Sequence, residues 1–296
     1  MLEALAQYKI LGRIGVGRMG ELFRARDTRA GRTVALRVVA DAIAGDPGRR
    51  QRFLTDARAA AALSHPNIAA LYEIAEDQER LFVVSEFVPG DTLRTLVSGR
   101  PLNLRHALEH GIQLADALAE GHAAGLLHRD IQPHNIIITP KGIAKFIDFG
   151  LGPWTASGEE RQRITSVAGD NAGSAPTVAY MAPEEVLGGA VDERSDLFSL
   201  GAVLFEMLAG TPPPLVPPAR NALTAEVLQM PPPPPSALNP TLPRELDAIV
   251  LKMLARRIDD RYAAAATVAA ELRSVGTVLD VREGAMEPSP VDSSQA

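Results

Sequence analysis

Apolar positions recur along this chain with two different periods, and the change of period divides it into two parts. Up to residue 39, apolar and polar residues alternate in short runs separated by glycines, which is the period-two pattern of β-strands. Two more runs of this kind lie between residues 68 and 88. The pattern predicts a small antiparallel sheet whose first three strands are "YKILGRIG", "GELFRARD" and "TVALRVVA", with a hairpin turn at residues 28–31.

A helix is expected inside this first part, after the third strand. Phe53, Ala57 and Ala60 are spaced three or four residues apart, so they share one face of a helix. Asp46 can cap its N-terminus, and Pro47 suits the first turn, where a backbone N–H would have no partner. The first part of the chain is therefore expected to be a sheet with one main helix.

The second part begins after a break at residues 89–91 and follows the helical period. Leu108, Ile112 and Leu118 belong to an apolar stripe at helical spacing. The longest apolar stretch, residues 197–210, is too short to span a bilayer and carries Glu206, so we expect a buried core helix. Two more helices are expected at "LPRELDAIVLKML" and "AAAATVAAELRSV", with a proline-rich surface connector at residues 231–243 and a disordered tail at residues 276–296.

One charged residue, Arg37, interrupts the apolar strand "TVALRVV" at residues 33–39. Side chains alternate along a strand, so Arg37 shares a face with Ala35 and lies opposite to Leu36. Burying a charge without a partner is very costly. The sequence therefore requires an anion beside Arg37.

The composition narrows the classes of function. The 296 residues are 46% hydrophobic and 22% charged, and the net charge of −6 gives no argument for a nucleic-acid or anionic-membrane partner. No cysteine is present, which excludes disulfides, thiolate metal sites and cysteine nucleophiles and is compatible with a reducing compartment. The first residues lack the basic segment and apolar run of a signal peptide.

Gly15, Gly17 and Gly20 in "GVGRMG" form a pattern that two kinds of nucleotide site share. In a dinucleotide-binding turn a helix follows the glycines at once, and Asp41 could then bind a ribose. Here a strand, a turn and another strand follow, which favours a hairpin whose exposed backbone N–H groups cover phosphates. A glycine-rich hairpin without a ligand is the alternative, and this segment alone leaves it open.

Polar residues that suit a metal and a phosphate gather in two downstream segments. "HRDIQPHN" supplies Asp130 and Asn135, and "FIDFG" supplies Asp148 between apolar residues and a glycine. Such oxygen ligands could hold Mg²⁺, which shares its coordination with phosphate, while one acid takes a proton from a hydroxyl. Alternatively each acid caps a turn, or His128 and His134 bind a metal, although no cysteine or third histidine lies nearby to complete a closed site.

The order of these segments is similar to that of a known family. The chain resembles the eukaryotic-like protein kinases, most closely the bacterial Ser/Thr type, over roughly residues 8–275. The resemblance implies an α+β, two-lobed protein-kinase-like fold, in which a small antiparallel β-sheet lobe with one main helix sits beside a larger, mostly α-helical lobe. It places the N-lobe at residues 8–87, the hinge at residues 86–91 and the C-lobe at residues 91–275. The motifs that carry it are "GVGRMG", "VALR", "HRDIQPHN", "DFG", "YMAPE", "RSDLFSLG" and the arginine of "DDRY".

The resemblance also implies roles for the acids of the larger lobe. Asp130 would be the catalytic base that orients the substrate hydroxyl, and Asn135 and Asp148 would be the Mg²⁺ ligands. Asp196 would brace the catalytic loop by accepting its hydrogen bonds. In addition, Glu184 would form a buried ion pair with the arginine of "DDRY", Arg261.

The implied ATP site lies between the lobes. The glycine loop, with Met19 at its tip, would cover the phosphates, apolar residues of both lobes would sandwich the adenine, and hinge backbone groups would meet its edge behind the small gatekeeper Ser85. The residues implied to bind the nucleotide are Gly15, Val16, Gly17, Gly20, Leu22, Ala35, Arg37, Glu86, Val88, Asn135, Ile137 and Asp148.

Three catalytic positions depart from the family pattern. The strand lysine is Arg37, the helix glutamate that partners it is Asp56, and the catalytic-loop lysine is Gln132. Arginine is longer than lysine and aspartate is shorter than glutamate, so we expect Arg37 and Asp56 to form a compensated ion pair. Gln132 keeps a donor but loses a charge, which at about 4 Å and an effective dielectric constant near 20 is worth at most about 4 kcal/mol.

The resemblance implies a protein serine/threonine kinase that transfers the ATP γ-phosphate to Ser or Thr hydroxyls, uses ATP and Mg²⁺, and could be weakened at Arg37, Asp56 and Gln132. The alternative is a pseudokinase, a nucleotide-binding or partner-binding scaffold, because nucleotide binding without transfer would explain most of the retained residues. The expected partner is a protein substrate or a signalling protein, with no nucleic acid and no membrane span in this chain, and the expected location is the cytoplasm.

Regulation is expected in the polar segment after Asp148. Arg129 precedes the catalytic base, which in this family marks enzymes whose segment is ordered by phosphorylation, because arginine can bind the added phosphate. An unmodified polar loop is the alternative. The regulatory candidates are Arg129, Thr165, Ser166, Ser174 and Thr177, the last at a substrate-side position typical of Ser/Thr specificity.

Overall fold

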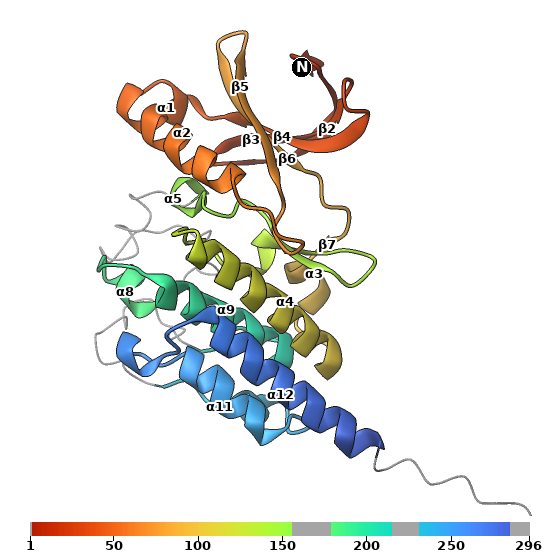
Figure 1. Cartoon of the computed structure of the whole chain (residues 1–296), viewed down its shortest axis with the longest axis vertical. Helices are drawn as coiled ribbons and strands as arrows, with labels where there is room; N and C mark the ends of the chain where they lie inside the picture. The colour runs from red at the N-terminus through yellow and green to blue at the C-terminus, as the bar shows by residue number, and fades with distance from the viewer. Residues whose placement is uncertain (1, 156–178, 215–230, 285–296) are drawn as a thin grey trace, which may run out of the picture.

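Two lobes stand one above the other in the structure (Figure 1). The structure, a computed structural model, describes residues 2–155, 179–214 and 231–284. A twisted sheet with helices α1 (Asp41–Ala44) and α2 (Pro47–Ala61) forms the N-terminal lobe, and the C-terminal lobe is mostly helical. The α+β, two-lobed fold class expected from the sequence is confirmed.

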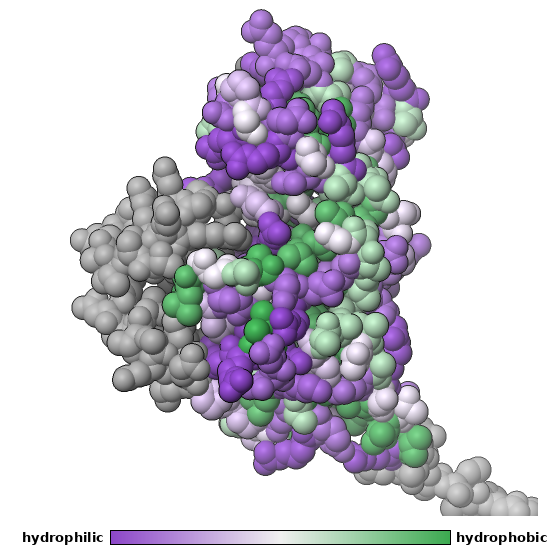
Figure 2. Space-filling view, turned by 60° about the vertical axis from the view of Figure 1, so that its left-hand side comes forward, coloured by the Kyte–Doolittle hydropathy of each residue, from purple (hydrophilic) through white to green (hydrophobic). Residues whose placement is uncertain are grey.

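The N-terminal sheet has antiparallel strands in the order β1-β2-β3-β4-β6-β5. Its two faces differ, because Phe23 and Leu36 are cross-strand partners in a buried apolar cluster, whereas Leu22 and Arg37 are partners on the opposite face. The outer surface of this lobe is mostly hydrophilic, and more of the hydrophobic residues on this side lie below it (Figure 2). The lobe begins before residue 8, because Leu5 of β1 is buried in the same cluster. The strands are β1 (Ala4–Leu5), β2 (Tyr8–Gly17), β3 (Gly20–Asp27), β4 (Arg32–Val39), β5 (Leu71–Asp77) and β6 (Arg80–Glu86).

Helix α2 forms for the reasons that its sequence suggests. The side chain of Asp46 accepts a hydrogen bond from the N–H of Arg49 at 2.7 Å, which caps the first turn. Phe53, Ala57 and Ala60 are its buried residues, so the predicted apolar face is confirmed. This face sets the position of α2 above the junction between the lobes.

Helix α9 (Glu193–Ala209) is the centre of the C-terminal lobe, and it is buried along almost its whole length. Asp192 caps its start, and Gly210 ends it in the left-handed conformation at φ 82°. Helices α4 and α11 pack against α9, and α12 packs against α4 and α11, so the buried core helix expected at residues 197–210 is confirmed. The other elements are α3 (Leu93–Val97), α4 (Leu104–Ala123), α5 (Gly152–Thr155), α8 (Pro183–Val186), α10 (Pro235–Leu238), α11 (Arg244–Met253), α12 (Ala265–Gly284), the 3-10 turns η1 (Pro133–Asn135) and η4 (Ile258–Asp260), and a sheet of β7 (Asp91–Thr92), β8 (Ile136–Ile138) and β9 (Ala144–Phe146).

The C-terminal end of the described chain differs from the expectation of a disordered tail from residue 276, because α12 continues to Gly284. Leu279 packs against the core of the lobe, Asp280 pairs with Arg105 of α4, and Arg282 pairs with Glu245 of α11 at 2.8 Å. These contacts keep the last turns of the helix on the lobe. Residues 285–296 lie outside the described residues.

The proline-rich connector at residues 231–243 also differs from the surface connector that the sequence predicted. Within it, α10 packs against α9 and α11. Pro235 and Ser236 are buried, and the Ser236 hydroxyl donates a hydrogen bond to Asp247 of α11 at 2.5 Å. Part of the connector therefore belongs to the core of the lobe.

Candidate active site

The catalytic loop between α4 and β8 is braced by a buried acid. Asp196 of α9 accepts hydrogen bonds from the backbone N–H groups of His128 at 2.8 Å and Arg129 at 2.9 Å, and it contacts Nε2 of His122 at 3.0 Å. Arg129 has φ 63°, a conformation that non-glycine residues seldom adopt, so these contacts hold a strained turn. The bracing role predicted for Asp196 is confirmed. The core of the lobe thereby fixes the backbone next to Asp130.

The carboxylate of Asp130 accepts hydrogen bonds from three side chains. Nε2 of Gln132 donates to Oδ1 at 2.8 Å, and Nδ2 of Asn135 donates to Oδ2 at 2.8 Å. The hydroxyl of Thr155, from α5, lies 2.6 Å from the same Oδ2. Gln132 and Asn135 were expected near the base because they share its loop, whereas Thr155 approaches from a separate element that the sequence pattern did not reveal.

The residue before Asp148 is hydrogen-bonded to the backbone of Asn135, which brings the two predicted metal-ligand segments together. The N–H of Ile147 donates to the carbonyl oxygen of Asn135 at 3.0 Å, and Asp148 itself has φ 56°. The amide nitrogen of Asn135 faces Asp130, which leaves its amide oxygen for a cation. One carboxylate and one amide oxygen fit Mg²⁺, which takes few protein ligands and completes its coordination with phosphate and water.

The structure does not form the ion pair that the sequence predicted between Arg37 and Asp56. Nη2 of Arg37 lies 2.5 Å from Oδ2 of Asp148, and these side chains are 13% and 16% exposed. Asp56 instead accepts a hydrogen bond from Nε1 of Trp154 at 2.8 Å. Arg37 therefore has the anion that it requires, but the anion is the predicted metal ligand.

Helix α5 is the physical reason for this exchange of partners. It follows "DFG" directly and lies just below α2 in Figure 1. Leu151 is buried in the cluster of Phe53 and Ala57, and the Trp154 ring packs edge-on against Phe53 with centroids 5.4 Å apart. An indole beside Asp56 supplies the donor that Arg37 was expected to supply.

The face of the N-terminal sheet that carries Arg37 is suited to a nucleotide. Ala35 and Ser85 are cross-strand partners on this face, and Leu22 is the partner of Arg37. A small cavity of about 20 Å³, lined by Arg37, Ser85 and Asp148 among others, lies next to it. Ile137 lies on β8 of the other lobe, and its contact with adenine stays a prediction.

The glycine loop joins β2 and β3, and one of its glycines is required by the backbone. Gly20 has φ 125°, and a Cβ there would lie 1.8 Å from the carbonyl oxygen of Val38. A Cβ at Gly15 or Gly17 would meet no atom within 4 Å, so the backbone does not require glycine at these two positions for lack of space. Val16 is 65% exposed, whereas the Met19 side chain, expected at the tip of the loop over the phosphates, is buried in the cluster of Phe53 and Leu151.

The hinge is anchored through the side chain of Glu86. Its carboxylate pairs with Nζ of Lys145 on β9 at 2.8 Å, and its backbone N–H donates to the carbonyl oxygen of Ala70 at 2.8 Å. Val88 follows as a buried residue at 5% exposure. The hinge backbone is thus fixed in place, and its contacts with a nucleotide stay a prediction.

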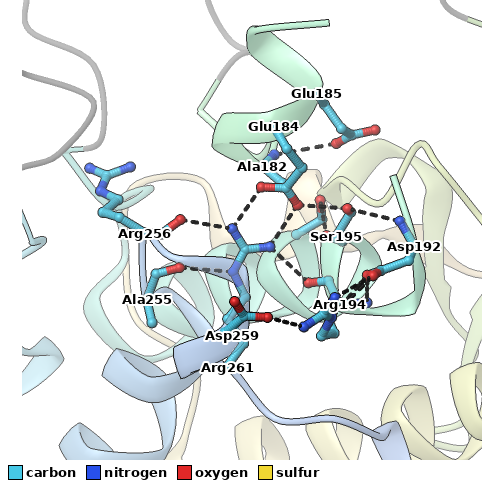
Figure 3. Close-up of polar contacts among 11 residues, drawn as sticks. Ala182, Glu184, Glu185, Asp192, Arg194, Ser195, Ala255, Arg256, Asp259 and Arg261 are labelled. Atoms are coloured by element: carbon cyan, nitrogen blue, oxygen red, sulfur yellow. Dashed lines mark hydrogen bonds and ion pairs between the residues drawn. The ribbon is translucent and has the colours of Figure 1, made fainter. Parts of the chain in front are cut away.

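The ion pair between Glu184 of α8 and Arg261 is formed as the sequence predicted (Figure 3). Nη1 and Nη2 of Arg261 donate to the two carboxylate oxygens of Glu184 at 2.7 and 2.8 Å, and Nε donates to the carbonyl oxygen of Ala255 at 2.8 Å. The Ser195 hydroxyl adds a bond to Glu184 at 2.6 Å. Burial raises the pKa of Glu184, but the hydrogen bonds from Arg261 and Ser195 outweigh it, so the pKa lies below its ordinary value.

Gly121, inside α4, contributes to the site although the sequence pattern did not indicate it. A Cβ at Gly121 would lie 2.2 Å from the ring of Phe149, so this glycine lets the ring lie against the helix backbone. Glycine in a helix interior costs about 1 kcal/mol relative to alanine, and that cost is the sequence signal that a close contact exists here. Gly121 thereby sets the position of Phe149, the neighbour of Asp148.

The structure gives no support to a histidine metal site. His128 is fully buried, and its ring packs against Phe146 and Phe149 with centroids 4.8 and 5.1 Å apart. Burial lowers the pKa of His128, which favours the neutral ring. His134 is exposed, and within the ranges that the structure describes no three His, Cys, Asp or Glu side chains form a metal-binding group.

The regulatory candidates fall almost entirely on residues that are not described. Thr165, Ser166, Ser174 and Thr177 lie outside the described residues. Arg129 is described, next to the base.

Comparisons with known proteins show which family this chain belongs to. A family model described as the protein kinase domain matches residues 8–272. The chain belongs to the protein kinase family. Serine/threonine-protein kinase PknB of Mycolicibacterium smegmatis is 36% identical to this kinase domain over 96% of the chain and 44% of the relative. PknB of Mycobacterium tuberculosis is 37% identical over 90% of the chain and 42% of the relative. The kinase domain therefore spans less than half the length of these curated relatives.

A solved structure supports the fold of the kinase domain independently. The crystal structure of the Mycobacterium tuberculosis PknI kinase domain matches it with a TM-score of 0.71 and 27% identity, over 93% of this chain and 97% of that one. Among the residues described here, no helix has both the length and the apolar character needed to cross a membrane.

Proposed function

We propose that this kinase domain is a protein serine/threonine kinase that transfers the γ-phosphate of ATP, with Mg²⁺, to a Ser or Thr hydroxyl of a protein. The observation that carries the proposal is the placement of Asp130. Its carboxylate is held by the amides of Gln132 and Asn135 in a loop that Asp196 braces, next to the oxygen ligands that Mg²⁺ would need.

In this mechanism Asp130 orients the acceptor hydroxyl and takes its proton. The hydrogen bonds from Gln132 and Asn135 fix the direction of the carboxylate before the acceptor arrives. Asp148 and Asn135 would hold Mg²⁺, which supplies charge neutralisation at the phosphates. Arg37 would turn from Asp148 toward the phosphates once a cation compensates that carboxylate.

With Gln132 we expect a slower reaction than with the lysine that is usual at this position in Ser/Thr kinases. It donates to Asp130 at 2.8 Å and so orients the base, but it brings no positive charge to the moving phosphate. The proposal therefore expects measurable but modest turnover. A pseudokinase, which binds the nucleotide without transfer, is an explicit outcome of the test below.

Two measurements on the same protein test the proposal. Thermal stabilisation by Mg²⁺ with ATP reports binding, and transfer of radiolabelled γ-phosphate to a generic basic protein substrate reports catalysis. We expect Asp130→Asn to lower transfer by about 10²–10⁴-fold while stabilisation by the nucleotide persists, because a general base contributes about that much. Asp148→Asn should weaken both signals.

Asp116→Asn is the matched control, because Asp116 is a surface acid of α4 that pairs with Arg273. It should leave both signals unchanged. Stabilisation without any transfer would select the pseudokinase, and the absence of both signals would contradict nucleotide binding altogether.

We also propose a cytoplasmic location and a protein partner. The support is the reaction itself, because ATP is an intracellular co-substrate and the acceptor is a protein hydroxyl. The absence of cysteine is compatible with that compartment.

A further inference from the structure

Three basic side chains lie together on the side of the N-terminal sheet that also carries Ala35. Lys9 of β2 and Arg26 of β3 are direct cross-strand partners, and Arg24 lies two residues from Arg26 on the same face. Directly opposite residues have Cβ atoms about 4.5–5.5 Å apart, and residues two positions apart on a strand are about 7 Å apart. These three exposed residues, Lys9, Arg24 and Arg26, form the basic face.

No acid neutralises the basic face. Two other basic residues of the sheet are paired, because Arg13 lies 3.8 Å from a carboxylate oxygen of Glu21 and Arg37 lies 2.5 Å from one of Asp148. Among the residues that the structure describes, none of the three side chains of the basic face has a hydrogen-bond or ion-pair partner. Their charges are therefore available to an anion from outside.

The basic face works against the stability of the sheet that carries it. Like charges directly opposite each other on neighbouring strands are destabilising, and Lys9 and Arg26 form such a pair. The cross-strand partner of Arg24 on β2 is Gly12, which has no side chain that could cover this arginine. Exposed residues that break a rule of sheet stability are expected where they serve a function, so the basic face is a candidate binding surface.

The charge of the N-terminal part of the chain agrees with an anionic ligand. Residues 1–88 carry 13 Lys and Arg against 11 Asp and Glu, although the whole chain carries 30 against 36. The part of the chain that contains the basic face thus has an excess of positive charge in a protein that is acidic overall. An acidic ligand is attracted to this lobe and repelled by the remainder of the chain.

The spacing of the three charges favours one class of ligand. Arg24 and Arg26 follow the period of a strand, so acidic side chains two residues apart on an extended protein segment would match them. Recognition of anionic lipid typically uses clusters of about 4–8 Lys or Arg, which is more than the basic face offers. The net charge of −6 opposes a nucleic acid, whose charge is not confined to a short segment.

We propose that the basic face is a docking site for an extended acidic segment of a protein partner, with carboxylates at alternate positions. The backbone of β3 is already paired with β2 and β4, so the segment binds through side chains alone. The docking site lies beside the predicted nucleotide site, because Arg24 is the cross-strand partner of Ala35. Docking does not require phosphoryl transfer, so its test is independent of the proposed kinase function.

The experiment measures binding of a fluorescein-labelled peptide of alternating Gly and Glu to the whole chain, by fluorescence anisotropy at low salt. Peptides of alternating Gly and Gln, and of alternating Gly and Lys, serve as probes without the acid. We expect saturable binding of the Glu peptide alone. This binding should weaken strongly in about 0.5 M NaCl, because salt screens interactions between exposed charges.

Substitutions locate the binding on the basic face. Replacing all three of its residues by Gln should weaken binding of the Glu peptide about tenfold or more, and each single replacement should weaken it about two- to fivefold. The matched control replaces Arg49, Arg52 and Arg80 by Gln, which removes three exposed charges from other surfaces of the same lobe. We expect this control variant to bind the peptide as the wild type does.

Lys9→Glu separates a binding role from a structural one. It places an acid opposite Arg26, so it should abolish binding of the Glu peptide while the unfolding midpoint in urea rises. A residue that served only the stability of the sheet would lower the unfolding midpoint when replaced. Loss of binding together with a gain of stability is therefore the signature of the docking site.

Several outcomes would overturn the proposal. The wild type could fail to bind the Glu peptide, or the triple Gln variant of the basic face could bind it equally well. Binding to vesicles that contain phosphatidylserine, without binding to the peptide, would assign the basic face to a membrane. Self-association that the triple variant loses, again without peptide binding, would assign it to a second copy of the chain. None of these results bears on phosphoryl transfer, which is measured separately.

Discussion

Arg261 lies in a network that the C-terminal lobe closes around it, whereas Arg37 lies at the junction of the lobes, where segments compete for the same acids. The Arg261 side chain is fully buried, and both its partner Glu184 and the surrounding carbonyl groups come from one packed region (Figure 3). Arg37 is partly exposed, and it contacts Asp148 while Asp56 is held by Trp154.

The difference shows how burial decides whether an ion pair is fixed or exchangeable. A fully buried arginine cannot lose its acid without leaving an uncompensated charge, so the pair of Arg261 with Glu184 is fixed. Arg37 keeps 13% of its side chain exposed, so water reaches part of the pair and Arg37 can exchange Asp148 for another anion. The first arrangement suits a structural joint, and the second suits a site that must accept a ligand.

Removing the buried arginine should have the largest effect. Arg261→Met leaves Glu184, whose side chain is only 16% exposed, without its partner and should lower the free energy of unfolding by about 3–5 kcal/mol, as measured by urea denaturation. Arg257→Met is the matched control in the same loop, because its side chain is 76% exposed, and it should change stability by less than about 1 kcal/mol. Equal losses in the two variants would contradict the contrast drawn here.

Removing the junction arginine should act on catalysis instead of stability. Arg37→Met deprives Asp148 of its cation and the phosphates of a positive group, and we expect kcat/KM to fall about 100-fold, equivalent to about 2.7 kcal/mol. The unfolding midpoint in urea should change little. Arg13→Met controls for loss of a charge from the same sheet, because that arginine is 62% exposed and 3.8 Å from Glu21.

Weakening the competitor for Asp56 should have a smaller effect of opposite sign. Trp154→Phe keeps an aromatic ring against Phe53 but removes the donor to Asp56, a hydrogen bond worth about 1 kcal/mol. Because α5 then holds the junction less firmly, we expect initial transfer to a basic protein to rise about fivefold. Unchanged or lower initial rates would mean that the indole does not compete for the site.

The smallest effect is the pH dependence of the buried pair. The pKa of Glu184 is lowered in the folded state, so its contribution to stability is present above the ordinary value of 4.5 and is lost as pH falls through the folded pKa. Wild type should therefore lose thermal stability more steeply below that pH than Glu184→Gln, which has no proton to take up. Parallel curves of melting temperature against pH would contradict this assignment.

The sequence could predict elements whose structure depends on residues close to one another in the chain. The face of α2 follows from the spacing of Phe53, Ala57 and Ala60, because a helix must bury its apolar side. The bracing by Asp196 and the pair of Glu184 with Arg261 were implied by the resemblance to the protein kinases, and both are formed. In each of these cases one arrangement satisfies the buried groups.

The sequence could not predict which side chains bond to each other at the junction between the two lobes. Asp56 has two possible donors, and only the position of α5 decides that Trp154 supplies the bond. The contact between Thr155 and Asp130 joins residues 25 positions apart through an element of four residues, too short to show a helical period. The end of α12 could not be predicted either. Its last turns are polar, and ion pairs to other helices hold them in place.

The pairing of Arg37 with Asp148 has a thermodynamic consequence for ligand binding. Each of the two side chains is the counter-ion of the other, so a metal ion arriving alone must displace the guanidinium, and a nucleotide arriving alone must draw Arg37 away from an uncompensated carboxylate. When both ligands arrive, each supplies the charge that the other displaces. Mg²⁺ and ATP should therefore strengthen each other's binding by the same factor, and the free domain would discriminate against either ligand by itself.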